Sequence, residues 1–530
     1  MKVHNGEEGR GAEPVRDESS DSSQSYELSR PAGRLETYFT LFHDLNLQSN
    51  IIVSASYAST EKRPLDASVL YPALRLVIKQ HPALSIVTSS RPSTLRANHS
   101  RAWEARIKVI NLKDCVSFIN HFDTSKDGLA SLLERQHNEW YRTEDKTKPL
   151  WRLLVVNHEH IIFVYHHLIC DGIGGLAFHK ALLAALNTVT MSPQSSEISP
   201  DASLVTTSTA PLAPVSSSAF ISLGYSYSTL RVATTYIYLF LLRLFLPRSF
   251  FFFPSIRPPP NPSTPGPPII TKLHSFTLNP QTLSRTLTAC KSHTTSLTSL
   301  LTTLILTTLS NDIYPRARFG IISIPTDLRR YIPRRLITES EIQNCASVCF
   351  TRTWLNAYKA AGQDLSGFET TTTGGPLNKS HIWALAAAHR SALERMIAPR
   401  GPGSRHTPAP IQESLSMGLL PEDKEPLVAQ CLPTLWTVSG GGVTVSNLGL
   451  FGDAAVAVDD MHWKISDVEF SVGATAPEVG SALYFAMVSS VDGGLRVNIS
   501  FAEGAVEEEI VERIAIGILG RLEGLLKGDE

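Results

Sequence analysis

The eight residues Tyr165-His166-His167-Leu168-Ile169-Cys170-Asp171-Gly172 carry the strongest signal for fold and chemistry in this 530-residue chain. Two histidines end an apolar run, and an Asp-Gly pair follows after three further residues. Free imidazole has a pKa of about 6.5, so a histidine can take up a proton near neutral pH. A histidine at a strand end, beside a turn that opens onto a cleft, is well placed to act as a general base. The alternative is a hydrogen-bonded histidine packed in the core.

The segments around this stretch predict a buried strand followed by a helix. Residues 151–157 and 161–165 are short apolar runs separated by His158-Glu159-His160, which is typical of a β-hairpin. The second run is apolar on both faces, so we expect a central strand covered on both sides. After Gly172-Ile-Gly-Gly175, the apolar spacing predicts a helix to about residue 187. Strands and helices mix without strict alternation in both halves, which favours a mixed α/β (α+β) fold.

Composition divides the chain into four parts. Residues 1–29 are rich in charged residues, Ser and Gly, which predicts a disordered tail. Residues 30–187 and 270–530 contain the predicted strands and helices, and we expect each range to form a lobe. Residues 188–269 are rich in Ser, Thr and Pro, which predicts a linker.

The linker contains a hydrophobic segment, residues 229–253. Its uninterrupted apolar part, 232–242, is shorter than the roughly 20 residues that span a bilayer, and Arg243 and Pro247 follow it. Three interpretations remain open: a buried or lid helix, a helix that lies on a membrane surface, and a transmembrane helix. The second interpretation predicts peripheral contact with an intracellular membrane.

Charge and cysteine content exclude several classes of protein. With 48 Lys+Arg against 49 Asp+Glu, the chain has no basic excess that would indicate a nucleic-acid partner. The six cysteines form no CxxC pair, so we expect reduced thiols in a cytoplasmic protein. His158, His160 and His166 are better explained as hairpin residues than as metal ligands, and we expect no metal. A GxSxG elbow, a phosphate loop and an HExxH motif are absent from the sequence.

The stretch His166–Gly172 resembles the HHxxxDG signature of the chloramphenicol-acetyltransferase-like superfamily, which includes peptide-synthetase condensation domains and fungal alcohol acetyltransferases. Further segments resemble the fungal alcohol acetyltransferase branch in the same chain order. These are Arg34-Leu-Glu-Thr-Tyr38, Gln80-His-Pro-Ala-Leu84, Ile324-Pro-Thr-Asp-Leu-Arg-Arg330, Asn344-Cys-Ala-Ser347, Val445-Ser-Asn-Leu-Gly449 and the terminal strand and helix. The resemblance covers about residues 31–187 and 270–526. The Asp-Phe-Gly-Trp-Gly element of the plant branch is absent.

The resemblance implies two similar lobes with a channel between them, which acyl-CoA and the acceptor enter from opposite faces. His167 would be the general base for direct attack of the acceptor on the thioester, without a covalent enzyme intermediate. Ser446 or Asn447 would face the channel, and either could donate a hydrogen bond to the tetrahedral oxyanion.

Four further residues would have structural roles in such a site. His166 would pack beside the channel, and Gly172 would permit the turn. Asp171 would point away from the histidine and pair with an arginine. By position Arg329 is the expected partner, with Arg330 as the alternative.

The resemblance therefore predicts an acyl-CoA-dependent O-acyltransferase that transfers acetyl from acetyl-CoA to a small-molecule alcohol. We expect a cytoplasmic monomer with acetyl-CoA as co-substrate and without a bound cofactor. An amine acceptor, which would make the protein an N-acyltransferase, stays open. So does a carrier-protein thioester donor, although the chain contains no carrier region, and so does a binding protein without activity.

Overall fold

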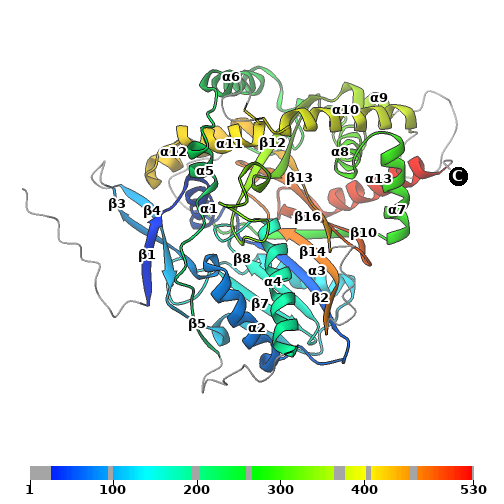
Figure 1. The fold of residues 1–530 in the computed structure, drawn as a ribbon. Helices are drawn as coiled ribbons and strands as arrows, with labels where there is room; N and C mark the ends of the chain where they lie inside the picture. Colours follow the sequence, from blue (N-terminus) through cyan, green and yellow to red (C-terminus); the bar gives the residue numbers. More distant parts are fainter. Residues whose placement is uncertain are drawn as a thin grey trace, which may run out of the picture.

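Two lobes lie side by side in the structure, a computed structural model that describes residues 25–93, 99–191, 203–257, 266–362, 377–400, 407–452 and 462–527. Each lobe is built on a mixed sheet with helices packed against it (Figure 1). The mixed α/β class and the two-lobed architecture predicted from the sequence are confirmed.

The sheet of the N-terminal lobe has five strands in the order β14, β2, β8, β7, β6. They are β2 (Ile51–Ser59), β6 (Val116–Ile119), β7 (Trp151–Val156), β8 (His160–Tyr165) and β14 (Trp463–Val472). The predicted hairpin is formed by β7 and β8, and β8 is the middle strand. Along β8, Ile161, Phe163 and Tyr165 belong to one apolar cluster, and Ile162 and Val164 belong to another. Both faces of β8 are covered, which explains its unbroken hydrophobic run.

Helices from the N-terminal half supply these covers. On one face lie α2 (Ala67–Gln80) and α4 (Gly172–Met191), and on the other lies α3 (Lys126–His137). The carboxylate of Asp66 caps α2 by accepting hydrogen bonds from the N–H groups of Ser68 and Val69. The helix ends at Gln80 because His81 precedes a proline, which disfavours the helical backbone conformation.

The sheet of the C-terminal lobe has six strands in the order β10, β16, β15, β13, β11, β12. They are β10 (Thr271–Leu278), β11 (Phe319–Asp327), β12 (Ala346–Trp354), β13 (Gly442–Phe451), β15 (Ser481–Ser490) and β16 (Gly494–Ala502). The helices of this lobe are α7 (Pro280–Ser292), α8 (Leu297–Thr308), α9 (Asn356–Ala361), α10 (Lys379–Ile397) and α13 (Glu508–Leu526). Strands and helices share one apolar core, in which Leu304 of α8 and Ile518 of α13 are buried.

Strand β14 belongs to the sheet of the other lobe. It pairs antiparallel with β2 from Trp463↔Ser59 to Val472↔Ile51, and Phe470 and Val472 are buried in the N-terminal core. The division into lobes at residues 187 and 270 was therefore wrong for residues 463–472. Their apolar pattern predicts a strand, but a strand pattern does not specify which sheet the strand joins.

Two smaller sheets flank the N-terminal lobe. One consists of β1 (Tyr26–Pro31), β4 (Ser100–Ile107) and β3 (Ile86–Pro92), and the other of β5 (Val109–Asn111) and β9 (Leu204–Thr206). The predicted end of the tail at residue 29 was wrong, since residues 26–29 form part of β1; residues 1–24 lie outside the described part. Half of the β1 side chains are exposed, and the strand is held by main-chain pairing with β4 together with partial packing of Tyr26 and Leu28 on the N-terminal core.

Four helices lie at the end of the molecule where the lobes meet: α1 (Arg34–Asp44), α6 (Thr229–Phe245), α11 (Ala409–Ser416) and α12 (Lys424–Val438). The short α5 (Ser216–Ser222) and α6 fall within the predicted linker, so this region is not structureless. Helix α6 packs on α12 and stands at the top of the view in Figure 1. In the described ranges, the structure contains no helix long and apolar enough to cross a membrane.

A buried histidine joins three elements of the N-terminal lobe. In His137 of α3, Nδ1 lies 2.7 Å from Asn50 Oδ1 and Nε2 lies 2.8 Å from Ser471 Oγ of β14. Burial, reinforced by the charge of Arg152, lowers the pKa of His137 to about 3. The unfolded chain therefore binds a proton below about pH 6.5 that the folded chain does not bind.

We predict that the free energy of unfolding falls as the pH is lowered from 6.5 to 4.5, by about 1.4 kcal/mol per pH unit for each such histidine. Urea unfolding at several pH values should show that the free energy of unfolding of His137→Gln falls less steeply with decreasing pH. The difference in slope corresponds to one proton, because glutamine does not titrate. The control is His121→Gln, since His121 is exposed. An unchanged slope in His137→Gln would contradict the prediction.

Candidate active site between the lobes

The stretch singled out from the sequence forms a turn at the end of β8. The main-chain N–H of His166 donates to the carbonyl of Leu150, and the hydroxyl of Tyr165 donates to the carbonyl of Asp171 at 3.0 Å. Helix α4 begins at Gly172. The turn thus extends from the middle strand of one lobe toward the other lobe, and its first and last residues are fixed by hydrogen bonds.

His167 lies in this turn and lines a cavity of about 790 Å³ between the lobes. Its ring is half-buried and stacks on Phe39 of α1, with ring centroids 3.6 Å apart. The side-chain amide of Asn344, from the C-terminal half, donates to the carbonyl of His167 at 2.7 Å. The same Asn344 nitrogen lies 3.1 Å from His167 Nδ1. Two lobes therefore hold one imidazole, with its Nδ1 side against Asn344.

The protonation state of His167 follows from its surroundings. Burial lowers the pKa of His167 to about 4, and the main-chain carbonyl of His167 and the charge of Asp171 only partly oppose this effect. At neutral pH the ring is therefore uncharged, and an uncharged imidazole is the form that can accept a proton.

The carboxylate of Asp171 points away from His167 and joins the two lobes. Its Oδ2 accepts hydrogen bonds from Arg329 Nη1 at 2.9 Å and from the N–H of Cys345 at 2.8 Å, and its Oδ1 accepts from the N–H of Gly174 at 2.7 Å. Arg329 is almost fully buried, and it also donates to the carbonyl of Gln343 at 2.5 Å. The partner of Asp171 is thus Arg329, while Arg330 is exposed.

His166 and Gly172 pack around the turn. His166 is buried, and its Nδ1 accepts a hydrogen bond from the N–H of Leu168 at 2.9 Å, while its Nε2 has no partner among the residues that the structure describes. Burial holds the pKa of His166 well below its ordinary value. A Cβ at Gly172 would lie 2.7 Å from Leu448 Cδ2 and 3.1 Å from Phe470, so a larger residue would crowd the lobe contact.

The lining of the cavity also contains Ser446 and Asn447 of β13, but the two differ in their contacts. The amide of Asn447 is used locally: Oδ1 accepts from the N–H of Gly449 at 2.9 Å, and Nδ2 donates to Thr298 Oγ1 at 3.1 Å. The hydroxyl of Ser446 hydrogen-bonds to that of Tyr484 on β15, whose pKa burial raises to about 12. Ser446 and Tyr484 are therefore a pair of neutral hydroxyls at the cavity wall.

Sequence reasoning assigned no role to Phe39, Asn344 and Tyr484. Asn344 belongs to the segment Asn344-Cys-Ala-Ser347, which was noted only for its resemblance to a family. The contacts of these residues join distant parts of the chain, so local spacing contains no signal for them. Within the described ranges, no group of three His, Cys, Asp or Glu side chains could hold a metal ion.

We predict that Arg329→Met lowers the free energy of unfolding by about 3–5 kcal/mol, because it leaves the buried carboxylate of Asp171 without its cation. Arg330→Met is the matched control and should change stability by less than about 0.5 kcal/mol, since that side chain is exposed. Urea unfolding of both variants at neutral pH measures the difference. Equal effects of the two substitutions would contradict the role given to the ion pair.

Known proteins share both sequence and fold with this chain. A family model described as alcohol acetyltransferase matches residues 31–348. The probable alcohol acetyltransferase crmB of Aspergillus fumigatus is 23% identical over 508 residues, which cover 92% of this chain and 97% of the relative.

Two solved structures show the same fold at low identity. A trichothecene 15-O-acetyltransferase from Fusarium sporotrichioides superposes with a TM-score of 0.65 at 13% identity, over 96% of both chains. The first condensation domain of the CDA synthetase superposes with a TM-score of 0.54 at 14% identity, over 96% of this chain and 97% of that chain. The family match spans more than half of the sequence, so the chain belongs to the alcohol acetyltransferase family and has the two-lobed fold of chloramphenicol-acetyltransferase-like enzymes and condensation domains.

Proposed function

We propose that the chain is an acyl-CoA-dependent alcohol O-acyltransferase, in its simplest form an acetyltransferase, with His167 as the general base. The observation that carries this proposal is the position of the His167 ring, which is uncharged, held by Asn344 and open to a cavity between the lobes. The cavity, of about 790 Å³, offers room for a thioester and an acceptor to meet. Acetyl-CoA is then a co-substrate that gives up its acetyl group and leaves as free CoA in each turnover. We expect the enzyme to act as a cytoplasmic monomer.

The base needs a nitrogen lone pair that faces the cavity. Nδ1 is the ring nitrogen nearest the backbone, and a proton on it can be shared with the carbonyl of His167, an interaction that raises the pKa of the ring. With the proton on Nδ1, Nε2 keeps its lone pair. Asn344 lies on the Nδ1 side of the ring and donates its amide hydrogen to the carbonyl of His167, so in this tautomer its 3.1 Å approach to Nδ1 is a contact and not a hydrogen bond.

The reaction then proceeds in two steps without a covalent enzyme intermediate. The acceptor oxygen forms a bond to the thioester carbonyl carbon while its proton passes to Nε2 of His167. The tetrahedral intermediate next breaks its C–S bond, and the proton passes from the ring to the leaving sulfur, which gives the ester and free CoA thiol. A positioned base of this kind contributes about 10²–10⁴-fold to the rate.

The negative charge on the intermediate's oxygen requires a donor. Ser446 supports this role better than Asn447 does, because both polar atoms of the Asn447 amide are already hydrogen-bonded. The hydroxyl of Tyr484 can accept the hydrogen bond of Ser446 or donate to it, so the two hydroxyls can turn one donor toward the substrate oxygen.

His167→Ala should lower acceptor-dependent release of CoA thiol by about 10²–10⁴-fold while the protein stays folded, which a thermal melt checks. The assay uses purified protein, acetyl-CoA and a panel of alcohols and amines, and the product is identified by mass. The control is His160→Ala, which removes a half-buried histidine from the far end of β8. Thiol release that persists undiminished in His167→Ala would overturn the mechanism, and products only with amines would overturn the alcohol assignment.

Ser446→Ala should lower kcat by about 10²–10³-fold, as is typical for removal of one oxyanion donor. Asn447→Ala removes the hydrogen bond to Gly449, so its main effect should be a loss of about 1 kcal/mol of stability. Steady-state kinetics and urea unfolding of both variants separate the two roles. A full kcat in Ser446→Ala, or the larger loss of kcat in Asn447→Ala, would contradict this assignment.

A further inference from the structure

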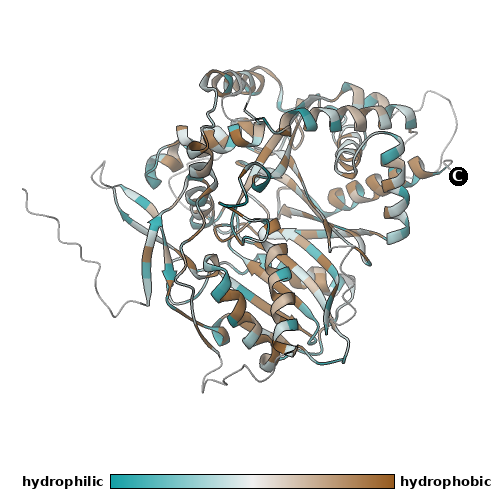
Figure 2. Cartoon of the chain, viewed as in Figure 1, coloured by the Kyte–Doolittle hydropathy of each residue, from teal (hydrophilic) through white to brown (hydrophobic). Residues whose placement is uncertain are grey.

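Helix α6 presents an apolar face that no described part of the protein covers. Leu230, Ile237, Leu241 and Leu244 recur along one side of the helix, at spacings of seven, four and three residues. The exposed fractions of the apolar side chains are 73% for Leu230, 54% for Ile237, 46% for Tyr238, 46% for Phe240, 42% for Leu241, 61% for Leu244 and 74% for Phe245. We call these seven residues the outer face of α6. Figure 2 shows hydrophobic residues recurring along this helix at the edge of the molecule.

The inner face of α6 reverses the usual arrangement of a surface helix, which turns charged groups to water. Leu239 is buried against Phe319 and Ile321, as expected for an inner position. Arg243 also points inward: its guanidinium donates to the carbonyls of Thr437 and Gly440 and lies 4.6 Å from the centre of the Trp436 ring. The helix thus holds the arginine of its last turn against the protein and turns its largest apolar groups outward.

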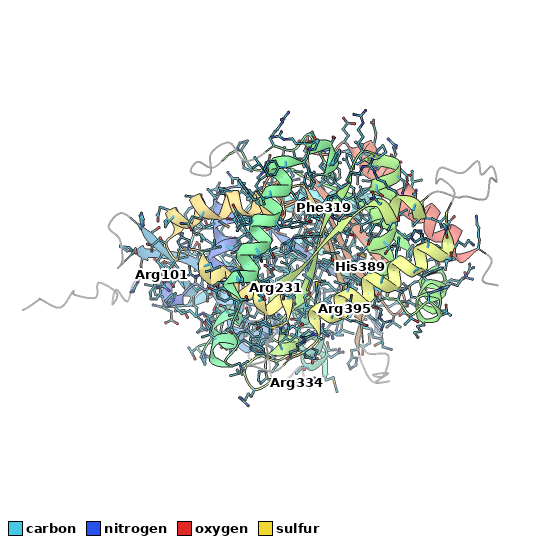
Figure 3. The ribbon with its side chains drawn as sticks, turned by 90° about the horizontal axis from the view of Figure 1, so that it is seen from above. Arg101, Arg231, Phe319, Arg334, His389 and Arg395 are labelled. Carbon is cyan, nitrogen blue, oxygen red and sulfur yellow. The ribbon has the colours of Figure 1, made fainter. Side chains whose placement is uncertain are left out.

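The charged residues of the sequence segment that contains this face are of one sign, although Glu413 of α11 lies near Arg231. No Asp or Glu occurs between residues 202 and 311, a range that contains the whole of α6. Arg231, Arg248 and Arg257 are exposed near the ends of the helix and in the segment after it. Figure 3 looks onto this side of the molecule and shows Arg231 near one end of the helix. An apolar stripe flanked by arginines fits an anionic lipid surface.

The same helix closes the cavity that contains His167. Val232 and Tyr236 on its inner side line that cavity, together with Thr229, Ala233 and Thr235. We propose that the outer face of α6 docks on an anionic lipid surface, and that the cavity behind it takes an apolar alcohol from that surface. The second half of this proposal rests on the acyltransferase function proposed above, whereas the first half does not.

Charge favours lipid over a second copy of the chain. Two copies that met through this face would bring their arginines together without a carboxylate from α6 or its neighbours in sequence, and like charges oppose such contact. Phosphatidylserine supplies the missing negative charge. The length of α6, 17 residues, is also short for a span, which agrees with a helix that lies along the surface.

Flotation of the purified full-length protein with lipid vesicles tests the docking. We expect the protein to float with vesicles of phosphatidylcholine and phosphatidylserine, and less with phosphatidylcholine alone. The variant Ile237→Glu/Leu244→Glu should reduce the bound fraction at least about tenfold, because it places two charges in the outer face. Neither residue lines the cavity.

The matched control is Leu287→Glu/Ile516→Glu, which introduces the same charges at apolar residues of α7 and α13 with exposed fractions of 40% and 45%. This variant should bind vesicles like the natural sequence, and thermal melts check that each variant folds. Absence of flotation with every vesicle, or equal loss in both double variants, would overturn the docking proposal. A dimer in light scattering that only the α6 variant dissociates would instead identify self-association.

Reaction rates on two alcohols test delivery of the acceptor from the lipid separately from acyl transfer itself. With acetyl-CoA, 1-butanol reaches the enzyme from water, whereas 1-hexadecanol is embedded in the vesicles. The α6 variant should lose about tenfold in rate on the embedded alcohol only. Delivery of the acceptor from the lipid would be overturned if the α6 variant and the natural sequence had equal rates on the embedded alcohol. It would also be overturned if the variant lost rate equally on both alcohols. No thiol release by the natural sequence with any alcohol would overturn the acyltransferase function, and flotation would still decide the docking.

Discussion

The buried ion pair between Asp171 and Arg329 is the interaction on which the rest of the site depends. A carboxylate in this position is tolerated because an arginine and two main-chain N–H groups, from both halves of the chain, satisfy it. Cys345, one of these donors, directly follows Asn344, which holds His167. The ion pair, the loop that contains Asn344 and the orientation of the imidazole are therefore one connected unit across the lobe boundary.

Much of the fold could be predicted from the sequence because it depends on local patterns. The continuous apolar run of β8 indicated a strand covered on both faces, and the apolar spacing after Gly172 indicated helix α4. The ion-pair partner followed from a family resemblance and not from spacing. Phe39, Asn344 and Tyr484 could not be found because each acts through a contact with a distant segment. Strand β1 was not predicted because only Tyr26 and Leu28 of its six residues pack on the apolar core, and its main-chain pairing with β4 is not visible in the sequence.

The apolar residues of helix α6 contact the protein on one side of the helix and are exposed on the other side. Hydrophobic residues all around a helix predict burial, and the sequence left open whether protein or lipid would cover it. The structure provides protein on one side only, where Leu239 packs on the C-terminal sheet and Arg243 is bound by carbonyl groups. An inward arginine gives the helix a fixed rotation about its axis, so the same residues always face the cavity and the same residues always face away.

The pairing of β14, from the C-terminal half of the chain, with the N-terminal sheet has a consequence for biosynthesis. Strand β2 ends at Ser59 and its partner begins at Trp463, about 400 residues later in the chain. At about 5–20 residues per second, a ribosome takes roughly 20–80 s to make the intervening sequence. Throughout that time β2 is an open sheet edge with hydrophobic neighbours, the kind of surface that aggregates. The nascent N-terminal lobe therefore exposes this edge until residue 472 has left the ribosome, and slower synthesis lengthens the exposure.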